Sequence, residues 1–98
     1  MRLFVNFKVF DTITSASEIN KLRGQFGEHV QTMMKSGKVE TSGIFTDGRQ
    51  GFFVLNVINP EEMWDLLGGV IVDHCHVETH PVSTFEKLGE FFRRHPAI

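Results

Sequence analysis

Ionisable side chains alternate along one short stretch in the last third of the chain. Every second residue of this row is a histidine or a glutamate: His74, His76, Glu78 and His80. Because successive side chains of a β-strand point to opposite faces, we expect all four on one face of a strand. Histidine titrates nearest neutral pH, and a carboxylate beside it can accept or return a proton. The row therefore predicts a place where a proton is transferred or a ligand is bound.

Three interpretations of this row are open at the level of sequence. It can be the solvated face of an edge strand that charge keeps soluble. It can be a proton-transfer or ligand-binding site. It can also hold Zn²⁺, because histidines at alternate strand positions lie about 6.6 Å apart at Cα and a carboxylate lies between them. No helical histidine pair or cysteine set supplies further ligands, so we expect neither a metal nor a cofactor.

Composition narrows the class of protein. The chain has 98 residues, a hydrophobic fraction of 41% and a formal net charge of −2, which indicates one small domain spanning 1–98 and argues against nucleic acid as a partner. A single cysteine, Cys75, excludes an internal disulfide and a multi-cysteine zinc site. The N-terminus lacks the apolar core of a signal peptide, and no run is long enough to span a membrane. We expect a cytoplasmic protein that meets no membrane.

Periodicity and end signals predict four strands and three helices. The strands are expected over 2–10, 38–45, 50–58 and 74–82. A capping box at 15–18 opens the first helix, and Gly37 ends it. Asn59 and Pro60 open the second helix, which Gly68 and Gly69 should end. A second capping box at 83–86 opens a C-terminal helix over 84–95.

This order of elements predicts the fold class. Strand, helix, strand, strand, helix, strand is the ferredoxin-like βαββαβ arrangement, an α+β fold whose antiparallel four-stranded sheet has the order 4-1-3-2 and carries its helices on one face. The other face would carry phenylalanines, among them Phe4 and Phe52. Since a bare apolar face marks an interface, we expect a homodimer that packs sheet against sheet. The extra C-terminal helix has an apolar side and should pack on its own or the partner subunit.

Three segments of the last third support a family resemblance: the run EEMWDLL at 61–67, the strand HVETHPV at 76–82, which matches the pattern acid-Ile-Glu-Val-Thr-Pro-Leu, and the ending RHPAI at 94–98. The chain resembles the dimeric α+β barrel superfamily and, in these segments, muconolactone isomerase. Residues 84–93 are inserted before the ending, and the first half matches only in outline. The resemblance implies a homodimeric barrel and a cofactor-independent isomerase. The superfamily also includes cofactor-free monooxygenases and small members of no known activity.

The expected strand order brings a candidate site together. The fourth strand neighbours the first, so His76 and Glu78 should lie beside Asn6 and Lys8. A cavity of this kind, with few polar groups and apolar walls, suits a small molecule. We predict His76 and Glu78 as catalytic residues, and as ligand-binding residues Asn6, Lys8, Phe4, Phe52, Asn56 and His74. By analogy with the isomerase, the ligand would be a small carboxylated or aromatic metabolite. The alternatives are a non-catalytic small-molecule-binding or structural protein, or a cofactor-free monooxygenase-like enzyme.

Overall fold

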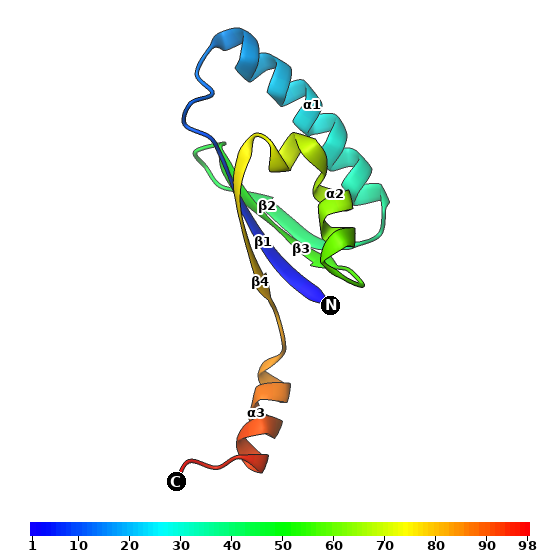
Figure 1. Cartoon of the computed structure of the whole chain (residues 1–98), viewed down its shortest axis with the longest axis vertical. Coiled ribbons are helices and arrows are strands. Elements are labelled where there is room, and N and C mark those ends of the chain that lie inside the picture. Colours follow the sequence, from blue (N-terminus) through cyan, green and yellow to red (C-terminus); the bar gives the residue numbers. More distant parts are fainter.

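Four strands and three helices make up the computed structural model, which describes all 98 residues (Figure 1). In chain order they are β1 (Arg2–Val9), α1 (Ala16–Lys35), β2 (Val39–Ile44), β3 (Gln50–Asn56), α2 (Pro60–Val72), β4 (Cys75–Pro81) and α3 (Phe85–Arg94). The strands form one antiparallel sheet in the order β2-β3-β1-β4. The predicted α+β fold, ferredoxin-like with an additional C-terminal helix, is confirmed.

Alternation along the central strands decides which face of the sheet forms the core. Leu3, Val5 and Phe7 of β1 are buried, while the residues between them are not. On β3 the buried positions are Phe53 and Leu55. Both sets pack in one cluster with Met33 of α1 and Leu67 of α2, the helices that cover one face of the sheet in Figure 1. The opposite face of the sheet carries no element of the chain.

The two covering helices begin where the sequence predicts. Ser15 Oγ accepts the Glu18 N–H at 3.2 Å at the start of α1, and Asn59 Oδ1 accepts the Glu62 N–H at 3.0 Å at the start of α2. Each bond satisfies a helix donor that would otherwise lack a partner. From these helices Met33, Met63, Leu67 and Ile71 complete the core. None of the helices combines the length and apolarity needed to cross a membrane.

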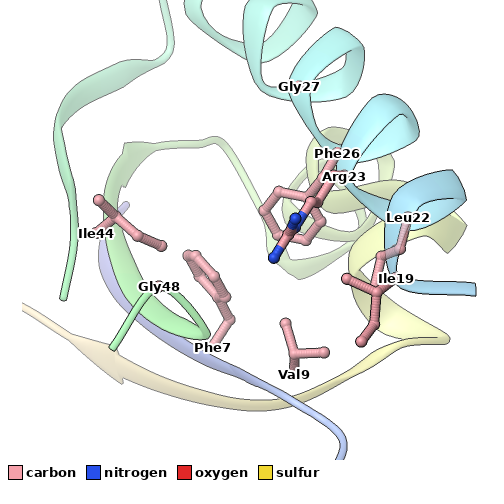
Figure 2. A pocket seen from close by; sticks show the side chains of 9 residues that line it. All are labelled: Phe7, Val9, Ile19, Leu22, Arg23, Phe26, Gly27, Ile44 and Gly48. Carbon is pink, nitrogen blue, oxygen red and sulfur yellow. The ribbon is translucent and has the colours of Figure 1, made fainter. Parts of the chain in front are cut away.

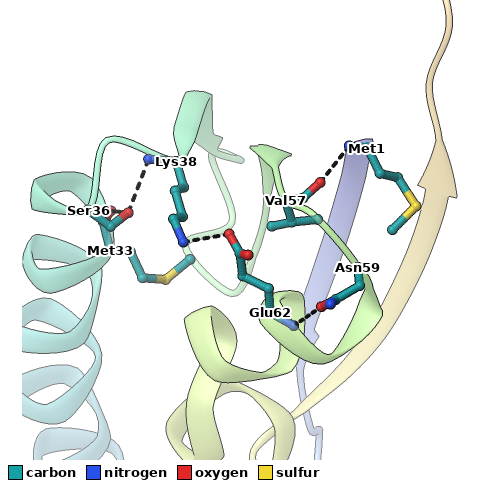
Figure 3. Close-up of polar contacts among 7 residues, drawn as sticks. All are labelled: Met1, Met33, Ser36, Lys38, Val57, Asn59 and Glu62. Carbon is teal, nitrogen blue, oxygen red and sulfur yellow. Dashed lines mark hydrogen bonds and ion pairs between the residues drawn. The ribbon is translucent and has the colours of Figure 1, made fainter.

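Polar contacts join the residue just before β2 to the first turn of α2 (Figure 3). The Lys38 ammonium pairs with the Glu62 carboxylate, and this hydrogen bond holds the pKa of Glu62 below its usual range. The N-terminal amine of Met1 donates to the Val57 carbonyl oxygen beside it. These contacts tie three segments that are distant in sequence at one end of the sheet.

The predicted helix end at the glycine pair is borne out only as a break within α2. The helix kinks at Gly68, whose φ of 64° and ψ of 174° are non-helical, and continues to Val72. His29 of α1 donates through Nε2 to the Leu66 carbonyl oxygen at 2.7 Å, next to the kink. A glycine can adopt this backbone conformation without strain, and the carbonyl finds its partner on the other helix. The kink is therefore a packing feature between α1 and α2.

Replacing Gly68 by alanine should lower the free energy of unfolding by about 1–3 kcal/mol, because this backbone region is close to glycine-only. An added Cβ would also lie 2.9 Å from His29 Cε1. Urea denaturation followed by circular dichroism measures the change. Gly24→Ala is the matched control, since nothing lies within 4 Å of its Cβ position in α1 and alanine favours a helix. Equal stability of the two variants would contradict the strain at Gly68.

The C-terminal helix α3 stands apart from the rest of the chain. Figure 1 shows it projecting from the end of β4, away from the sheet and both covering helices. None of its residues is buried, and the molecule measures 59 × 27 × 22 Å along its principal axes. The predicted helix is present, but none of its side chains is buried against the rest of the chain.

Candidate functional site

Three of the four residues of the ionisable row lie on the uncovered face of the sheet. We name this surface the open sheet face. It comprises the outward residues of the three neighbouring strands: Phe4, Asn6 and Lys8 of β1, Gln50, Phe52, Val54 and Asn56 of β3, and His76, Glu78 and His80 of β4. The strand order thus brings most of the predicted site residues to one surface.

The strand register sets which of these residues are neighbours. Asn6 pairs with Glu78 on one side and with Phe52 on the other, and Lys8 pairs with His76. Directly opposed residues of antiparallel strands have Cβ atoms about 4.5–5.5 Å apart. An amide, a carboxylate, an ammonium and an imidazole are therefore grouped at one edge of the open sheet face, with a phenyl ring next to them.

His74 lies outside this group. Strand β4 begins only at Cys75, because α2 continues to Val72 and Asp73 caps it by donating to the Gly69 carbonyl oxygen at 2.9 Å. Alternation does not extend into the turn before a strand. The His74 ring instead donates through Nδ1 to the Val70 carbonyl oxygen at 2.8 Å and borders a cavity beside the start of α1.

Asn56 also lies apart from the group. It pairs with Arg2 at the opposite end of β1 from Lys8, about 13 Å along the strand from Phe52. It borders a cavity of about 410 Å³ at the base of α3, together with Pro81 and Lys87. The structure brings together Asn6, Lys8, His76 and Glu78, but not Asn56.

Asn6 carries the unusual feature of the open sheet face. Its Oδ1 is buried and has no hydrogen-bond partner, although no second chain covers this face. A buried acceptor without a partner costs about 1–3 kcal/mol, and a native structure usually explains such a group by an ion, a water or a ligand. The rings of Phe4 and Phe52, stacked with centroids 5.6 Å apart, lie on the same face. The unpaired acceptor is thus next to an aromatic wall.

The histidine row itself is open to solvent in a single chain. Glu78 and His80 approach to 3.8 Å, but their side chains are 73% and 65% exposed, and an exposed pair of this kind adds little stability. The ring of Phe10 meets the His76 imidazole edge-on, with centroids 4.6 Å apart. No three His, Cys, Asp or Glu side chains are gathered closely enough to hold a metal ion. In a single chain the row therefore lies exposed on an edge strand of the sheet.

Two further features of the open sheet face were not singled out from the sequence. Gly43 of β2 makes room for the Phe52 ring, since an added Cβ would lie 2.6 Å from Phe52 Cε1. Phe45 extends the aromatic wall, with its centroid 6.3 Å from that of Phe52. A glycine inside a strand signals such a close approach. This signal could have placed Gly43 beside the phenylalanine.

Arg49 positions the loop after β1, in which Phe10 contacts the His76 ring. Its guanidinium donates to the carbonyl oxygens of Phe10 and Ile13 at 2.9 and 3.0 Å. Its backbone N–H donates to the Asp47 carboxylate in the hairpin turn, and this bond lowers the pKa of Asp47. The turn thus carries an anchor for the segment that places Phe10 against the imidazole.

The opposite side of the sheet has cavities lined mainly by apolar side chains, with few groups that could transfer a proton or bind a metal. One cavity of about 220 Å³ lies between α1 and the end of the β2–β3 hairpin (Figure 2), and Arg23 is its only ionisable residue. Cys75 also faces this side; burial raises the pKa of its thiol to about 11, so it is protonated at neutral pH. Cys75 is a core residue, as its alternation in β4 predicts.

No protein-family model matches the chain, and the search of curated proteins finds no match. The ferredoxin-like α+β fold therefore rests on the structure. The similarity to muconolactone isomerase rests on the segments at 61–67, 76–82 and 94–98 alone, and what it implies about activity belongs to the proposal below.

Proposed function

We propose that the protein is a homodimeric α+β barrel whose open sheet faces close over a small-molecule site formed by His76, Glu78, Asn6 and Lys8. The unpaired, buried Oδ1 of Asn6 carries this proposal. It is an acceptor with no donor in its own chain, beside a carboxylate on one neighbouring strand and a phenyl ring on the other. A ligand that supplies an O–H or N–H donor would relieve its cost.

A second copy supplies the cover that this face lacks. Phe4, Phe52 and Val54 lie on the open sheet face without any element of the chain above them. Two such faces related by a two-fold axis bury each other, and packed sheets lie about 10 Å apart. The polar side chains near β4 would then lie in a partly closed space lined by aromatic rings, which is the usual form of a small-molecule site.

The side chains select the ligand class. The Lys8 ammonium attracts a carboxylate or an enolate, and the aromatic wall suits a planar ring or an unsaturated chain. The Asn6 acceptor requires a hydroxyl or amine donor on the ligand. These contacts fit a small carboxylated or aromatic metabolite with at least one donor group.

Proton transfer is the chemistry that these residues support. His76 or Glu78 would remove a proton from the carbon next to a carbonyl group, and Lys8 would stabilise the enolate that forms. Return of the proton to a different carbon gives an isomer without an oxidant or cofactor. This is the cofactor-independent isomerase that the similarity in the last third implies. The strong exposure of Glu78 and His80 favours the second candidate, a non-catalytic binding protein.

Ligand-observed NMR with a panel of small unsaturated carboxylic acids and lactones tests the site. We expect the parent to bind at least one member and to exchange its activated hydrogen for deuterium in D₂O. His76→Ala and Glu78→Ala should each slow this exchange by about 10²–10⁴-fold, the usual contribution of a general acid or base. Glu61→Ala, an exposed change on α2, is the control.

Each outcome assigns the function differently. Binding that is lost in both variants, with no deuterium exchange by the parent, would identify a binding protein. Parent-like binding and exchange in both variants would remove His76 and Glu78 from the site. Light scattering of every variant checks that the oligomeric state is unchanged.

A further inference from the structure

The outer border of β4 is a regular strand edge without a partner. Strand β4 has β1 on one side and no strand on the other, and its pairing with β1 runs from Cys75 to Pro81 without a register shift. The other edge strand, β2, is interrupted by a register shift between Val39 and Thr41. Helix α3 projects beyond the end of β4, away from this border (Figure 1). A regular strand edge is a template for a further strand, and we name this one the β4 edge.

Hydrogen bonds to β1 show which backbone groups point to the β4 edge. The Phe10 N–H donates to the His74 carbonyl oxygen at 3.0 Å. At the other end of β4, the Val82 N–H donates to the Arg2 carbonyl oxygen at 2.9 Å. Since residues of an antiparallel strand direct these groups to alternate sides, the even-numbered residues of β4 bond to β1. The odd-numbered residues direct theirs to the β4 edge, and three of them carry an N–H: Cys75, Val77 and Thr79.

An apolar groove adjoins the β4 edge. It lies between α2 and β4, has a volume of about 440 Å³ and is lined mainly by apolar side chains. Trp64 and Val72 of α2 border this groove and are 59% and 45% exposed. Val77 and Thr79 border it from the strand. Large exposed apolar side chains gathered beside unpaired backbone groups indicate a protein interface.

The ionisable row makes the β4 edge complementary to itself. A two-fold axis normal to the sheet would set a second copy antiparallel to the first and keep the same residues on the same face. When Val77 lies opposite the partner's Val77, His76 lies opposite the partner's Glu78, and the symmetric pair forms as well. An imidazole and a carboxylate in opposed positions attract each other. The neighbouring register, centred on Glu78, would oppose two carboxylates, which is unfavourable.

We propose that β4 pairs with β4 of a second copy in the register centred on Val77. Here Val77 exchanges hydrogen bonds with the partner's Val77, and Cys75 exchanges them with the partner's Thr79. With the symmetric pair this gives about six bonds. A register centred on Thr79 would oppose Val77 to the partner's Pro81, which has no N–H to donate. Both α2 helices stay on one side of the joined sheet, so the grooves of the two copies adjoin.

This contact lies outside the open sheet faces. Facing sheets are about 10 Å apart and paired strands about 4.8 Å apart, so packing of the faces leaves the β4 edge free. A contact made by one strand and one groove belongs to the small, weak class, and we expect it at about 0.1 mM protein and above. Where it forms, the partner's Glu78 would orient the imidazole of His76; this consequence alone rests on the proposed function.

Disulfide cross-linking between differently tagged chains tests the register. His76→Cys in one chain and Glu78→Cys in the other, both with Cys75→Ala, are mixed at high protein concentration and mildly oxidised. Opposed residues of this kind have Cα atoms about 4.5 Å apart, within the range of a disulfide, so we expect a covalent dimer with both tags. In the matched control His80→Cys replaces His76→Cys. It would lie about 13 Å along the strand from the partner's residue 78 and should cross-link at least tenfold less.

Thr79→Pro tests the hydrogen bonds of the contact. The substitution removes an N–H that points to the β4 edge and none that bonds to β1, and proline is tolerated at such positions of edge strands. We expect the dissociation constant of the edge contact, measured by sedimentation equilibrium, to rise about tenfold or more. Thr79→Ala keeps the N–H and is the matched control, with a nearly unchanged constant. Far-ultraviolet circular dichroism checks that both variants are folded.

Three results would overturn the pairing: equal cross-linking by His76→Cys and His80→Cys, no covalent dimer with both tags, or equal dissociation constants for the two Thr79 variants. If Thr79→Pro does not fold, the cross-linking decides alone. Ligand binding and deuterium exchange are measured at micromolar concentration, where the edge contact is dissociated. A failed edge contact therefore leaves the proposed site standing, and a parent that cross-links as expected but binds no ligand rejects the site alone.

Discussion

Phe52→Lys should dissociate the proposed homodimer into folded monomers at micromolar concentration. Phe52 lies in the middle of the open sheet face, where it stacks on Phe4 and covers Gly43. In the proposed dimer its replacement would bury one ammonium from each subunit without a partner, which is costly. In the monomer the same ammonium reaches water, so the fold is kept. Light scattering gives the mass, and far-ultraviolet circular dichroism reports the fold.

Ile58→Lys is the matched control for this prediction. Ile58 follows β3, is 81% exposed and lies outside the open sheet face, so the same introduction of charge should leave the mass unchanged. A Phe52→Lys variant that keeps the parent's dimeric mass would place the interface elsewhere. A parent that is monomeric at these concentrations would contradict the barrel itself.

Leu55→Ala should remove about 2–5 kcal/mol from the free energy of unfolding, as is typical for truncating a fully buried leucine. Leu55 is 0% exposed on β3 and pairs with Leu3 of β1 and Val39 of β2. The core is small, with 12 buried hydrophobic residues. A loss of this size is a large part of the total stability of about 5–15 kcal/mol for a native protein. Urea denaturation at a fixed protein concentration measures it.

Ile58→Ala is the corresponding exposed truncation and should change stability by no more than about 0.5 kcal/mol. A comparable loss in the two variants would mean that burial does not set the stability of this sheet. Protein concentration is held fixed because formation of the proposed dimer would add a concentration-dependent term to the measured stability.

Local signals in the sequence determined the elements and their order. The side chains that open the three helices, Ser15, Asn59 and Thr84, each accept the N–H three residues further on. Alternation identified the buried face of β1 and placed Cys75 opposite His76. These features depend on neighbours within a few residues, so a single sequence contains what is needed to predict them.

The candidate site was partly predictable for the same reason. The βαββαβ order fixes β4 beside β1, and alternation puts His76 and Glu78 on the face of Asn6 and Lys8. His74 was misplaced because the start of a strand is set by where the preceding helix ends. That end lies beyond the break at Gly68, which sits beside His29, 39 residues earlier in the chain.

Tertiary structure alone decided the remaining features. Burial of the Asn6 amide oxygen follows from packing between two neighbouring strands, and the identity of the residue does not predict this burial. The position of α3, away from the sheet and both covering helices, is visible only in the folded chain. The sequence determined that α3 is an amphipathic helix, because that property repeats every three to four residues. Where its apolar face lies depends on contacts between segments far apart in the chain, which only the folded arrangement defines.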